Sequence, residues 1–295
     1  MNAALNSDLL ANKPSTWQAR LSLVFAKRQR GVRLVRSEHE GPLYVQKAFY
    51  PEGPDCAHVY LLHPPGGLVT GDTLNIDVTA QTNTHVLLTT PGAGRVYKAR
   101  EEGGIQTQNL HITVEENAVL EWFPLETILF PSSHARMKTR VDLSAGAAFI
   151  AWDITCFGLP ANDVEFDSGS VNQNIQIWRE GKILLNESLV IDENDSAILA
   201  GNAGLRNLPV HGLMLAGPFN ADDADLVDLI ASLRQLQAQA VSNEFFAISL
   251  NGEFMTVRYL GACTEKARQL FTQAWALIRP VLIQKESTEP RIWAT

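Results

Sequence analysis

A glycine-rich loop over residues 66–73 has the spacing of a phosphate-binding loop. Asp72 occupies the position of that loop's lysine, and a carboxylate repels the phosphates that the lysine would contact. The residues that follow, Leu74 to Val78, alternate as a strand, whereas phosphate binding needs the N-terminus of a helix. We therefore expect this loop not to bind a nucleotide, and we interpret the later Gly92-Ala93-Gly94 as a turn.

Carboxylates inside apolar strands are a more informative chemical signal. Asp153 lies within the apolar run Phe149 to Phe157, and Glu187 lies within Ile183 to Ile191. An isolated buried carboxylate is very costly, so each needs a compensating partner. One interpretation is that each accepts hydrogen bonds or lies on a solvent-facing side of its strand. The other is that the two line a wet internal path for a cation, with Asp72 at its mouth.

Paired carboxylates also carry out glycoside hydrolysis, which requires a defined separation between the two groups. Candidates for such a pair are Glu121, Glu126 and Asp153. The sequence alone does not place any two of them at that separation. A polysaccharide-acting enzyme on a β-solenoid is therefore the alternative function.

Cysteine and histidine spacing gives little support for a metal centre. Cys56 and His58 are two residues apart and would share one face of a strand, while His63 would face the other way. Two ligands do not complete a transition-metal site, and packing is the commoner role for such residues in an apolar strand. With Cys156 and Cys263 the chain has three widely spaced cysteines, a pattern that argues against a disulfide framework and a structural zinc site.

Composition narrows the class of protein. The 295 residues carry a net charge of −8, which lacks the basic footprint needed for nucleic acid or anionic membranes. Met1 to Lys13 has no basic, apolar signal pattern, so we expect a cytoplasmic protein. Charged residues make up only 19% of a chain that is 45% hydrophobic, which is a weak indication of protein partners.

The elements that position these residues are mainly strands. Turn residues such as Pro64-Pro65-Gly66-Gly67 and Glu180-Gly181 separate short runs of alternating or β-branched residues. The clearest runs are Leu43 to Phe49, His58 to Leu62, Leu74 to Thr79, His85 to Thr89, Ile105 to Val114, Arg136 to Leu143, Phe149 to Cys156, Val171 to Trp178 and Ile183 to Ile191. Such spacing without helical crossovers predicts an all-β body: a sandwich, a barrel or a wound solenoid.

Helical periodicity appears only in the last third of the chain. Apolar residues at helical spacing predict one amphipathic helix over about 221–240 and a second that begins with Thr264 as N-cap and ends at Pro280. A strand-like segment, Phe245 to Tyr259, lies between them, and we expect an irregular tail from Gln284 to Thr295.

We expect a single domain, because no interior linker divides the chain. Its predicted parts are a flexible segment at 1–16 and one domain at 17–295. That domain comprises a β body to about 215, a helix-containing part over 216–283 and the tail.

Two motifs follow each other along the chain: His63-Pro64-Pro65-Gly66-Gly67-Leu68-Val69-Thr70-Gly71-Asp72, and Thr89-Thr90-Pro91-Gly92-Ala93 with Tyr97-Lys98. Together with later motifs in the same order, they resemble the urease accessory protein D family, called UreD, or UreH in some organisms. The resemblance runs from about Trp17 to the C-terminus. Later matches are Leu120-Glu121-Trp122-Phe123-Pro124, Val257-Arg258-Tyr259-Leu260-Gly261 and Pro290-Arg291-Ile292-Trp293. The signature residues of its first motifs are His63, Pro64, Pro65, Gly66, Gly67, Gly71, Asp72, Thr90, Pro91, Gly92 and Tyr97.

The resemblance implies a non-enzymatic role in a β-helix-like fold with a few helices. Proteins of this family join UreF and the GTPase UreG on apo-urease and help to insert nickel into its active site. The implied partners are thus UreF, UreG through the complex, and the urease subunits. By the same resemblance, Asp72, Asp153 and Glu187 are candidates for nickel passage, with nickel as transient cargo and no tightly bound cofactor. Oxygen ligands hold nickel loosely, which suits a relay.

Overall fold

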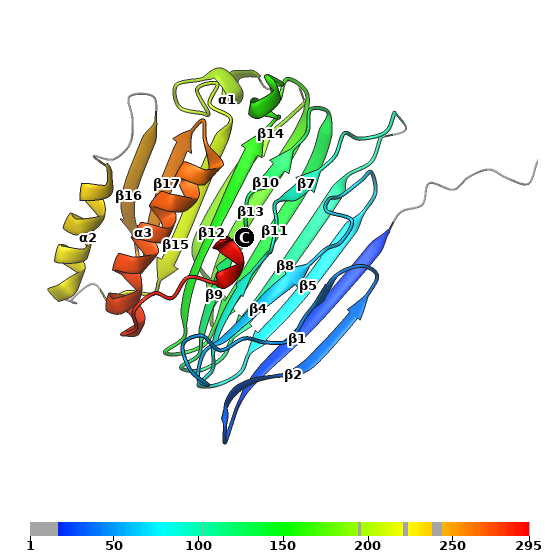
Figure 1. Ribbon diagram of the computed structural model, residues 1–295. Helices are drawn as coiled ribbons and strands as arrows, with labels where there is room; N and C mark the ends of the chain where they lie inside the picture. The colour runs from blue at the N-terminus through cyan, green and yellow to red at the C-terminus, as the bar shows by residue number, and fades with distance from the viewer. Residues whose placement is uncertain (1–16, 102, 194–195, 221–223, 238–243, 295) are drawn as a thin grey trace, which may run out of the picture.

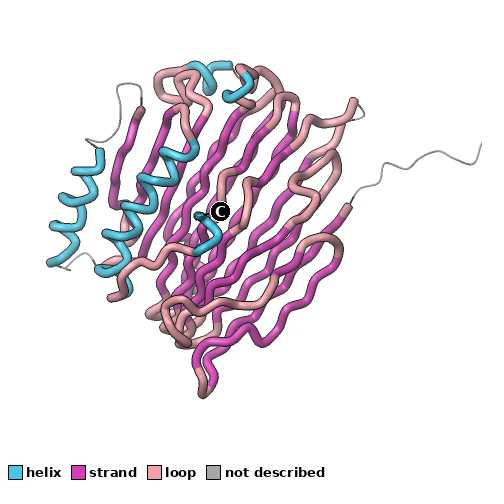
Figure 2. Tube along the Cα trace, viewed as in Figure 1, coloured by secondary structure: helices cyan, strands magenta, loops and turns pink. Residues whose placement is uncertain are grey.

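The computed structural model describes residues 17–101, 103–193, 196–220, 224–237 and 244–294. The predicted flexible segment at 1–16 lies outside the described residues. Two β-sheets face each other, and two long helices cover the outer face of one of them (Figures 1 and 2).

Sheet 1 contains seven strands within the described residues, in the order β14-β13-β11-β8-β5-β1-β2. Their bounds are β1 (Gln18–Arg28), β2 (Gly31–Glu40), β5 (Thr73–Ala80), β8 (Gln106–Val114), β11 (Ser133–Leu143), β13 (Gly169–Arg179) and β14 (Lys182–Ile191). The strands from β1 to β13 pair in parallel, while β2 and β14 add antiparallel edges.

Sheet 2 has the order β16-β17-β15-β12-β9-β6-β4-β3 over the same described parts of the chain, and β10 pairs with both β12 and β7. The bounds are β3 (Tyr44–Val45), β4 (Ala57–Leu62), β6 (His85–Thr89), β7 (Gly94–Val96), β9 (Val119–Phe123), β10 (Thr127–Leu129), β12 (Ala148–Phe157), β15 (Val210–Gly217), β16 (Phe245–Asn251) and β17 (Phe254–Gly261). Strands β4, β6, β9 and β12 are parallel neighbours.

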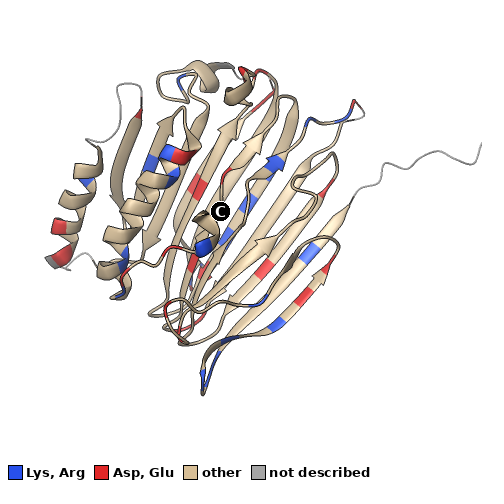
Figure 3. Cartoon of the chain, viewed as in Figure 1, with Lys and Arg blue, Asp and Glu red and all other residues tan. Residues whose placement is uncertain are grey.

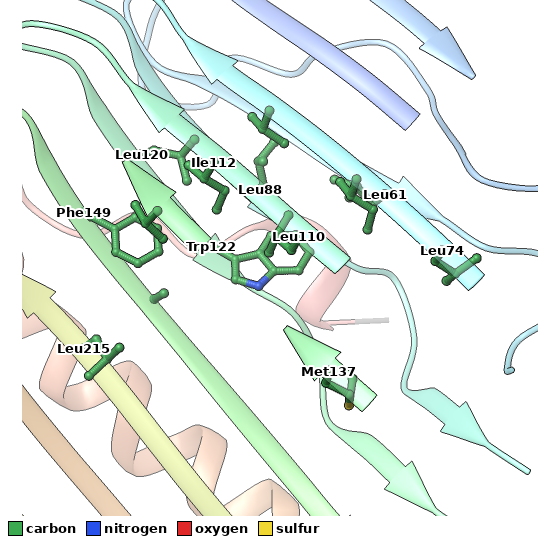
Figure 4. Close-up of a cluster of buried hydrophobic side chains, with 14 of the residues drawn as sticks. Leu61, Leu74, Leu88, Leu110, Ile112, Leu120, Trp122, Met137, Phe149 and Leu215 are labelled. Carbon is green, nitrogen blue, oxygen red and sulfur yellow. The ribbon is translucent and has the colours of Figure 1, made fainter. Parts of the chain in front are cut away.

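The chain winds between the sheets. β4 and β12 of sheet 2 lead directly to β5 and β13 of sheet 1, and β6 and β9 lead through the short strands β7 and β10 to β8 and β11. This arrangement confirms the predicted wound β body. Alternation in the strands explains it: β5 buries Leu74, Ile76 and Val78 between the sheets and turns its polar residues outward. Figure 4 shows part of this inter-sheet core, including Trp122 and Phe149.

Three α-helices lie in the described residues: α1 (Ser196–Ala200), α2 (Ala224–Gln237) and α3 (Thr264–Ile283). α3 packs on β12, β15 and β17, and α2 packs on α3 and β16. A second core therefore forms on the outer face of sheet 2, around Trp152 and Trp275. No described helix is long and apolar enough to cross a membrane.

The helical and tail predictions need correction at their ends. Cys263 is the N-cap of α3 and Thr264 its first residue, and the helix continues through Pro280 to Ile283. Pro280 has no backbone N–H and so removes only one hydrogen-bond donor from the helix. Gln284, in a left-handed conformation, closes the helix by donating its N–H to the Pro280 carbonyl. The tail contains a 3₁₀ turn at Arg291–Ala294. The predicted ends of the first helix, 221–223 and 238–240, lie outside the described residues.

The strand predictions missed the first hairpin, β1 and β2, because charged residues interrupt its apolar pattern. The predicted strand Leu43 to Phe49 is reduced to β3 and one bridge between Phe49 and His58. Phe245 to Tyr259 is a hairpin, β16 and β17.

Charges of both signs are interspersed along the strands in the view of Figure 3.

Candidate functional site

Two loops that carry most of the signature residues are joined by backbone hydrogen bonds. The first follows β4 and the second follows β6. Leu68 donates its N–H to the Arg95 carbonyl at 2.7 Å and accepts the N–H of Tyr97 at 2.9 Å. The hydroxyl of Thr90 accepts the N–H of Leu125 at 2.9 Å, which ties the second loop to the segment after β9. The loops are therefore held as one unit.

Gly67 is required where these loops meet. A Cβ at this position would lie 2.5 Å from the Tyr97 ring and 2.8 Å from the Arg95 carbonyl oxygen. Both distances are shorter than any normal contact, so only glycine fits. Gly92, another signature residue, would meet nothing within 4 Å, so the structure gives no steric reason for it.

Asp72 is buried and holds its own loop together. Its carboxylate accepts the N–H of Val69 at 2.9 Å and the N–H of Trp17 at 3.3 Å. β5 begins at the next residue, Thr73, one residue before the predicted strand Leu74 to Thr79. A strand rather than a helix thus follows the loop. The absence of nucleotide binding at this loop remains a prediction.

The signature loops border a cavity of about 300 Å³ between the two sheets, called here the loop cavity. Asp153, Gln173, Trp122 and Met137 are among its lining residues, and Figure 4 labels the last two. The signature residues that line it are His63, Gly66, Gly67, Thr90, Pro91 and Gly92. Asp72 does not line it.

A second cavity of about 190 Å³ adjoins the first and is called here the edge cavity. Asp153, Gln173 and Ile175 line both cavities. Glu187 of β14 and Arg258 of β17 also line the edge cavity. The structure thus brings Asp153 and Glu187, from opposite sheets, to one cavity and leaves Asp72 outside it.

Asp153 faces the interior between the sheets. Burial raises the pKa of its carboxyl above the usual range, and a hydrogen bond of 3.2 Å from the Thr155 hydroxyl acts against that rise. Gln173 of the facing sheet donates to the same hydroxyl oxygen at 2.7 Å. The Asp153 carboxyl thus accepts a hydrogen bond from a hydroxyl group, as the first interpretation of the sequence expected, and the Gln173 amide holds that hydroxyl in place. The cavity leaves room for water beside the carboxyl.

Glu187 is ion-paired rather than isolated. Arg258 donates from Nη2 to its Oε1 at 2.6 Å and from Nη1 to the Thr256 hydroxyl at 2.8 Å. Burial, with a smaller contribution from the Arg258 charge, lowers the pKa of His211 to about 4. His211 lines the same cavity and is therefore a neutral imidazole at neutral pH.

Sequence reasoning missed Arg258 and His211, since both come from strands that approach Glu187 only in the fold. The available signal was Arg258 within the motif Val257 to Gly261.

Glu121 lies on the other side of sheet 2, under α3. Its Oε1 accepts hydrogen bonds from His85 at 2.6 Å and Arg279 at 3.0 Å, and its Oε2 accepts one from Trp275 at 2.6 Å. Its strand neighbours Leu120 and Trp122 point into the inter-sheet core, so Glu121 points away from that core. Glu121 and Asp153 therefore face opposite sides of the sheet and cannot form a catalytic pair.

Glu52 joins the predicted pair Cys56 and His58, and one potential ligand atom of each lies within 4.8 Å of the other two. Arg279 donates to both oxygens of Glu52, at 2.8 and 2.9 Å. Burial opposes ionisation of Glu52, but hydrogen bonds from His58 and Arg279 outweigh it and lower its pKa to about 2. Burial also raises the pKa of the Cys56 thiol, so the thiolate is disfavoured. A guanidinium already fills the place of a cation, and we interpret this cluster as structural.

Comparisons with known proteins identify the family. The model of the UreD urease accessory protein family matches residues 18–294. The urease accessory protein UreD of Marinomonas sp. (strain MWYL1) is 52% identical over 285 residues, covering 95% of this chain and 91% of that protein.

Two further relatives have the same name. UreD of Aliivibrio fischeri (strain ES114) is 41% identical over 95% of this chain and 97% of its own, and UreD of Methylobacillus flagellatus is 35% identical over 99% of both. The match spans the wound sheets, the signature loops and α3 alike, and this chain belongs to the urease accessory protein UreD family.

Proposed function

We propose that this protein is a non-enzymatic scaffold that assembles with UreF and the GTPase UreG on apo-urease and helps to insert nickel into its active site. Membership of the UreD family supports the accessory role. The observation that carries the nickel part is the edge cavity, where Asp153 of sheet 2 and Glu187 of sheet 1 line one space between the sheets.

The two adjoining cavities define the path that we propose for nickel. It enters beside the signature loops, follows the loop cavity to Asp153 and leaves past Glu187. Carboxylates and water are weak ligands for nickel compared with thiolates and imidazoles. We propose that the two carboxylates on this path bind the ion weakly enough to release it again, as a transient cargo requires.

Asp72 has a supporting role in this proposal. Its carboxylate accepts the N–H of Val69 in its own loop and the N–H of Trp17, and it does not line either cavity. We propose that it shapes the mouth of the path by fixing the loop, rather than by contacting the ion.

Surface composition supports partners of the accessory complex. Several large apolar side chains are exposed, and Val227 of α2 is 71% exposed. Apolar surface of this kind is covered in stable complexes. We propose that UreF covers such surface, so the protein aggregates when expressed alone and becomes soluble when expressed with UreF. A monodisperse monomer at high concentration that shows no binding to UreF in size-exclusion chromatography would contradict this.

Isosteric amides test the path. Asp153→Asn and Glu187→Gln remove the negative charges while keeping side-chain size, and each should lower the nickel content of urease assembled with the variant. The matched control is Glu253→Gln, because Glu253 is also paired with an arginine between the sheets but lines neither cavity.

The readouts are urease nickel by elemental analysis and the melting temperature of each variant. Reduced nickel without a lowered melting temperature supports the path. Normal nickel with both amide variants rejects it, as does a loss of nickel that the control shares.

A further inference from the structure

Two ion pairs connect the sheets at the β14 side of the molecule within the described residues. Arg179 of β13 pairs with Glu253, in the turn before β17, at 2.7 and 2.8 Å. Glu187 of β14 pairs with Arg258 of β17 at 2.6 Å. Only the second pair lines the edge cavity. Both pairs thus connect the two sheets, but only the Glu187–Arg258 pair also lies at a cavity.

The Glu187–Arg258 pair lies at the mouth of the edge cavity. The side chains of Arg258 and Glu187 are 36% and 23% exposed, so both reach solvent while lining the cavity. Arg258 faces the interior because it aligns with Leu213 of β15, which belongs to the inter-sheet core. The pair therefore stands between the interior carboxyl of Asp153 and the solvent.

Arg258 differs from the other residues that line the edge cavity in the sign of its charge. The cavity is lined by the carboxyl groups of Asp153 and Glu187 and by the neutral imidazole of His211. Arg258 supplies the positive charge among the residues that line it, and it occupies Oε1 of Glu187. A cation that uses Glu187 as a ligand must first displace this guanidinium.

We propose that Arg258 is the gate of the nickel path: its guanidinium holds Glu187 when no ion is present, and a passing divalent cation exchanges with it. This inference rests on the proposed function and adds a residue that controls it. The bond from Arg258 to the Thr256 hydroxyl retains the side chain at the mouth during the exchange. The gate keeps the resting affinity low, because the ion must compete with a bound cation.

The gate also explains why an arginine stands at this position. Its planar fork reaches the carboxylate of Glu187 with one nitrogen and the Thr256 hydroxyl with the other. A lysine supplies the same charge from one nitrogen, without that fixed geometry. We therefore expect Arg258→Lys to preserve a low affinity, since it keeps the positive charge beside Glu187.

Equilibrium dialysis of the untagged, full-length chain against Ni²⁺ tests the gate. Arg258→Gln frees Glu187 and should raise nickel affinity at least about tenfold, as expected for removing one charge a few ångströms away. Arg258→Gln combined with Glu187→Gln should return the affinity to the wild-type value. Arg179→Gln, which breaks the other inter-sheet ion pair, should leave it unchanged.

The melting temperature of each variant is measured alongside its affinity. If Arg258→Gln does not fold, the conservative variant Arg258→Lys provides the test. If Arg258 is the gate, the Arg258→Lys variant binds nickel with an affinity within a few-fold of wild type. Arg258→Lys combined with Glu187→Gln then binds nickel no more tightly than Arg258→Lys alone. Equal affinities for wild type, Arg258→Gln and Arg179→Gln would overturn the gate. So would tighter binding by Arg179→Gln to the same extent as Arg258→Gln.

Urease nickel content separates this inference from the proposed function. An ion that is held too tightly is delivered less well, so Arg258→Gln should lower urease nickel while raising affinity. Unchanged affinity in Arg258→Gln, with nickel lost in Glu187→Gln, overturns the gate and leaves the path. Raised affinity in Arg258→Gln, with normal nickel in both Asp153→Asn and Glu187→Gln, overturns the path and leaves Arg258 as the counter-ion that keeps Glu187 from binding cations.

Discussion

Arg279 and Glu121 form an ion pair in which neither side chain is exposed to solvent. The pair joins α3 to β9, and Arg279 also binds Glu52 in the loop before β4. Burial opposes the charge of Glu121, but hydrogen bonds and charges from His85 and Arg279 outweigh it, so its pKa is lowered. This cluster fixes α3 on the outer face of sheet 2.

Breaking this pair should destabilise the protein strongly. Arg279→Met leaves Glu121 and Glu52 buried without their shared cation, which costs about 3–5 kcal/mol. Urea unfolding at neutral pH measures the loss. The control is Arg36→Gln, since Arg36 and Glu38 form a pair at an exposed position on β2. Similar urea midpoints of unfolding for the two variants would show that the buried ion pair stabilises the protein no more than the exposed one.

Gly67→Ala should destabilise the signature loops by about 1–3 kcal/mol, the usual cost of overpacking. The added methyl group would lie against both the Tyr97 ring and the Arg95 carbonyl oxygen. Gly92→Ala is the matched control, because Gly92 has open space around it. Thermal unfolding compares them, and an unchanged melting temperature for Gly67→Ala would refute the close-approach argument.

His211 predicts how stability depends on pH. Its pKa is about 4 in the folded chain and 6.5 when unperturbed, so the unfolded chain binds the proton first as pH falls. The contribution is complete above pH 6.5 and is lost as pH falls toward 4. Between pH 7 and pH 5 this costs about 2 kcal/mol.

His211→Gln should flatten that part of the stability curve, as measured by urea unfolding at a series of pH values. His63 shifts in the same direction through burial, so a smaller slope should remain. An NMR titration of His211 near pH 6.5 in the folded protein would contradict the prediction.

Asp153→Asn should stabilise the protein at neutral pH. Burial raises the pKa of Asp153, so its favourable contribution is present below the unfolded pKa of 3.8 and is lost as pH rises. The amide removes that cost and can still accept the Thr155 hydroxyl. We expect a higher melting temperature at pH 7 and no difference near pH 3. A variant that is both more stable and poorer in nickel delivery would show that this carboxyl is kept for function.

The all-β body was predictable because its signals are local: alternation and turn residues recur along each strand. These signals did not choose between a sandwich, a barrel and a wound solenoid, and the expectation of a β-helix-like fold came from the family resemblance. Asp153 and Glu187 were predictable as unusual carboxylates for the same reason. Their partners were not, since Glu187 meets Arg258 across 71 positions and Glu121 meets Arg279 across 158. Which face a carboxylate occupies depends on such distant contacts.

The helix boundaries show a different limit. Pro280 is a helix-ending signal in sequence, yet packing of α3 on sheet 2 carries the helix to Ile283. Tertiary contacts there outweigh a local preference.

The buried charge cluster has a consequence for how the chain folds during synthesis. The parallel strands of each sheet pair with strands that were made shortly before them, so the coils can close in order as they emerge. The outer face of sheet 2 cannot, because Glu52 and Glu121 receive their cation from Arg279, 227 and 158 positions later. Until α3 has been made, Trp152 and these two carboxylates lie on an uncovered surface. Among the described elements, the outer face of sheet 2 therefore stays open longer during synthesis than the coils of the β body do.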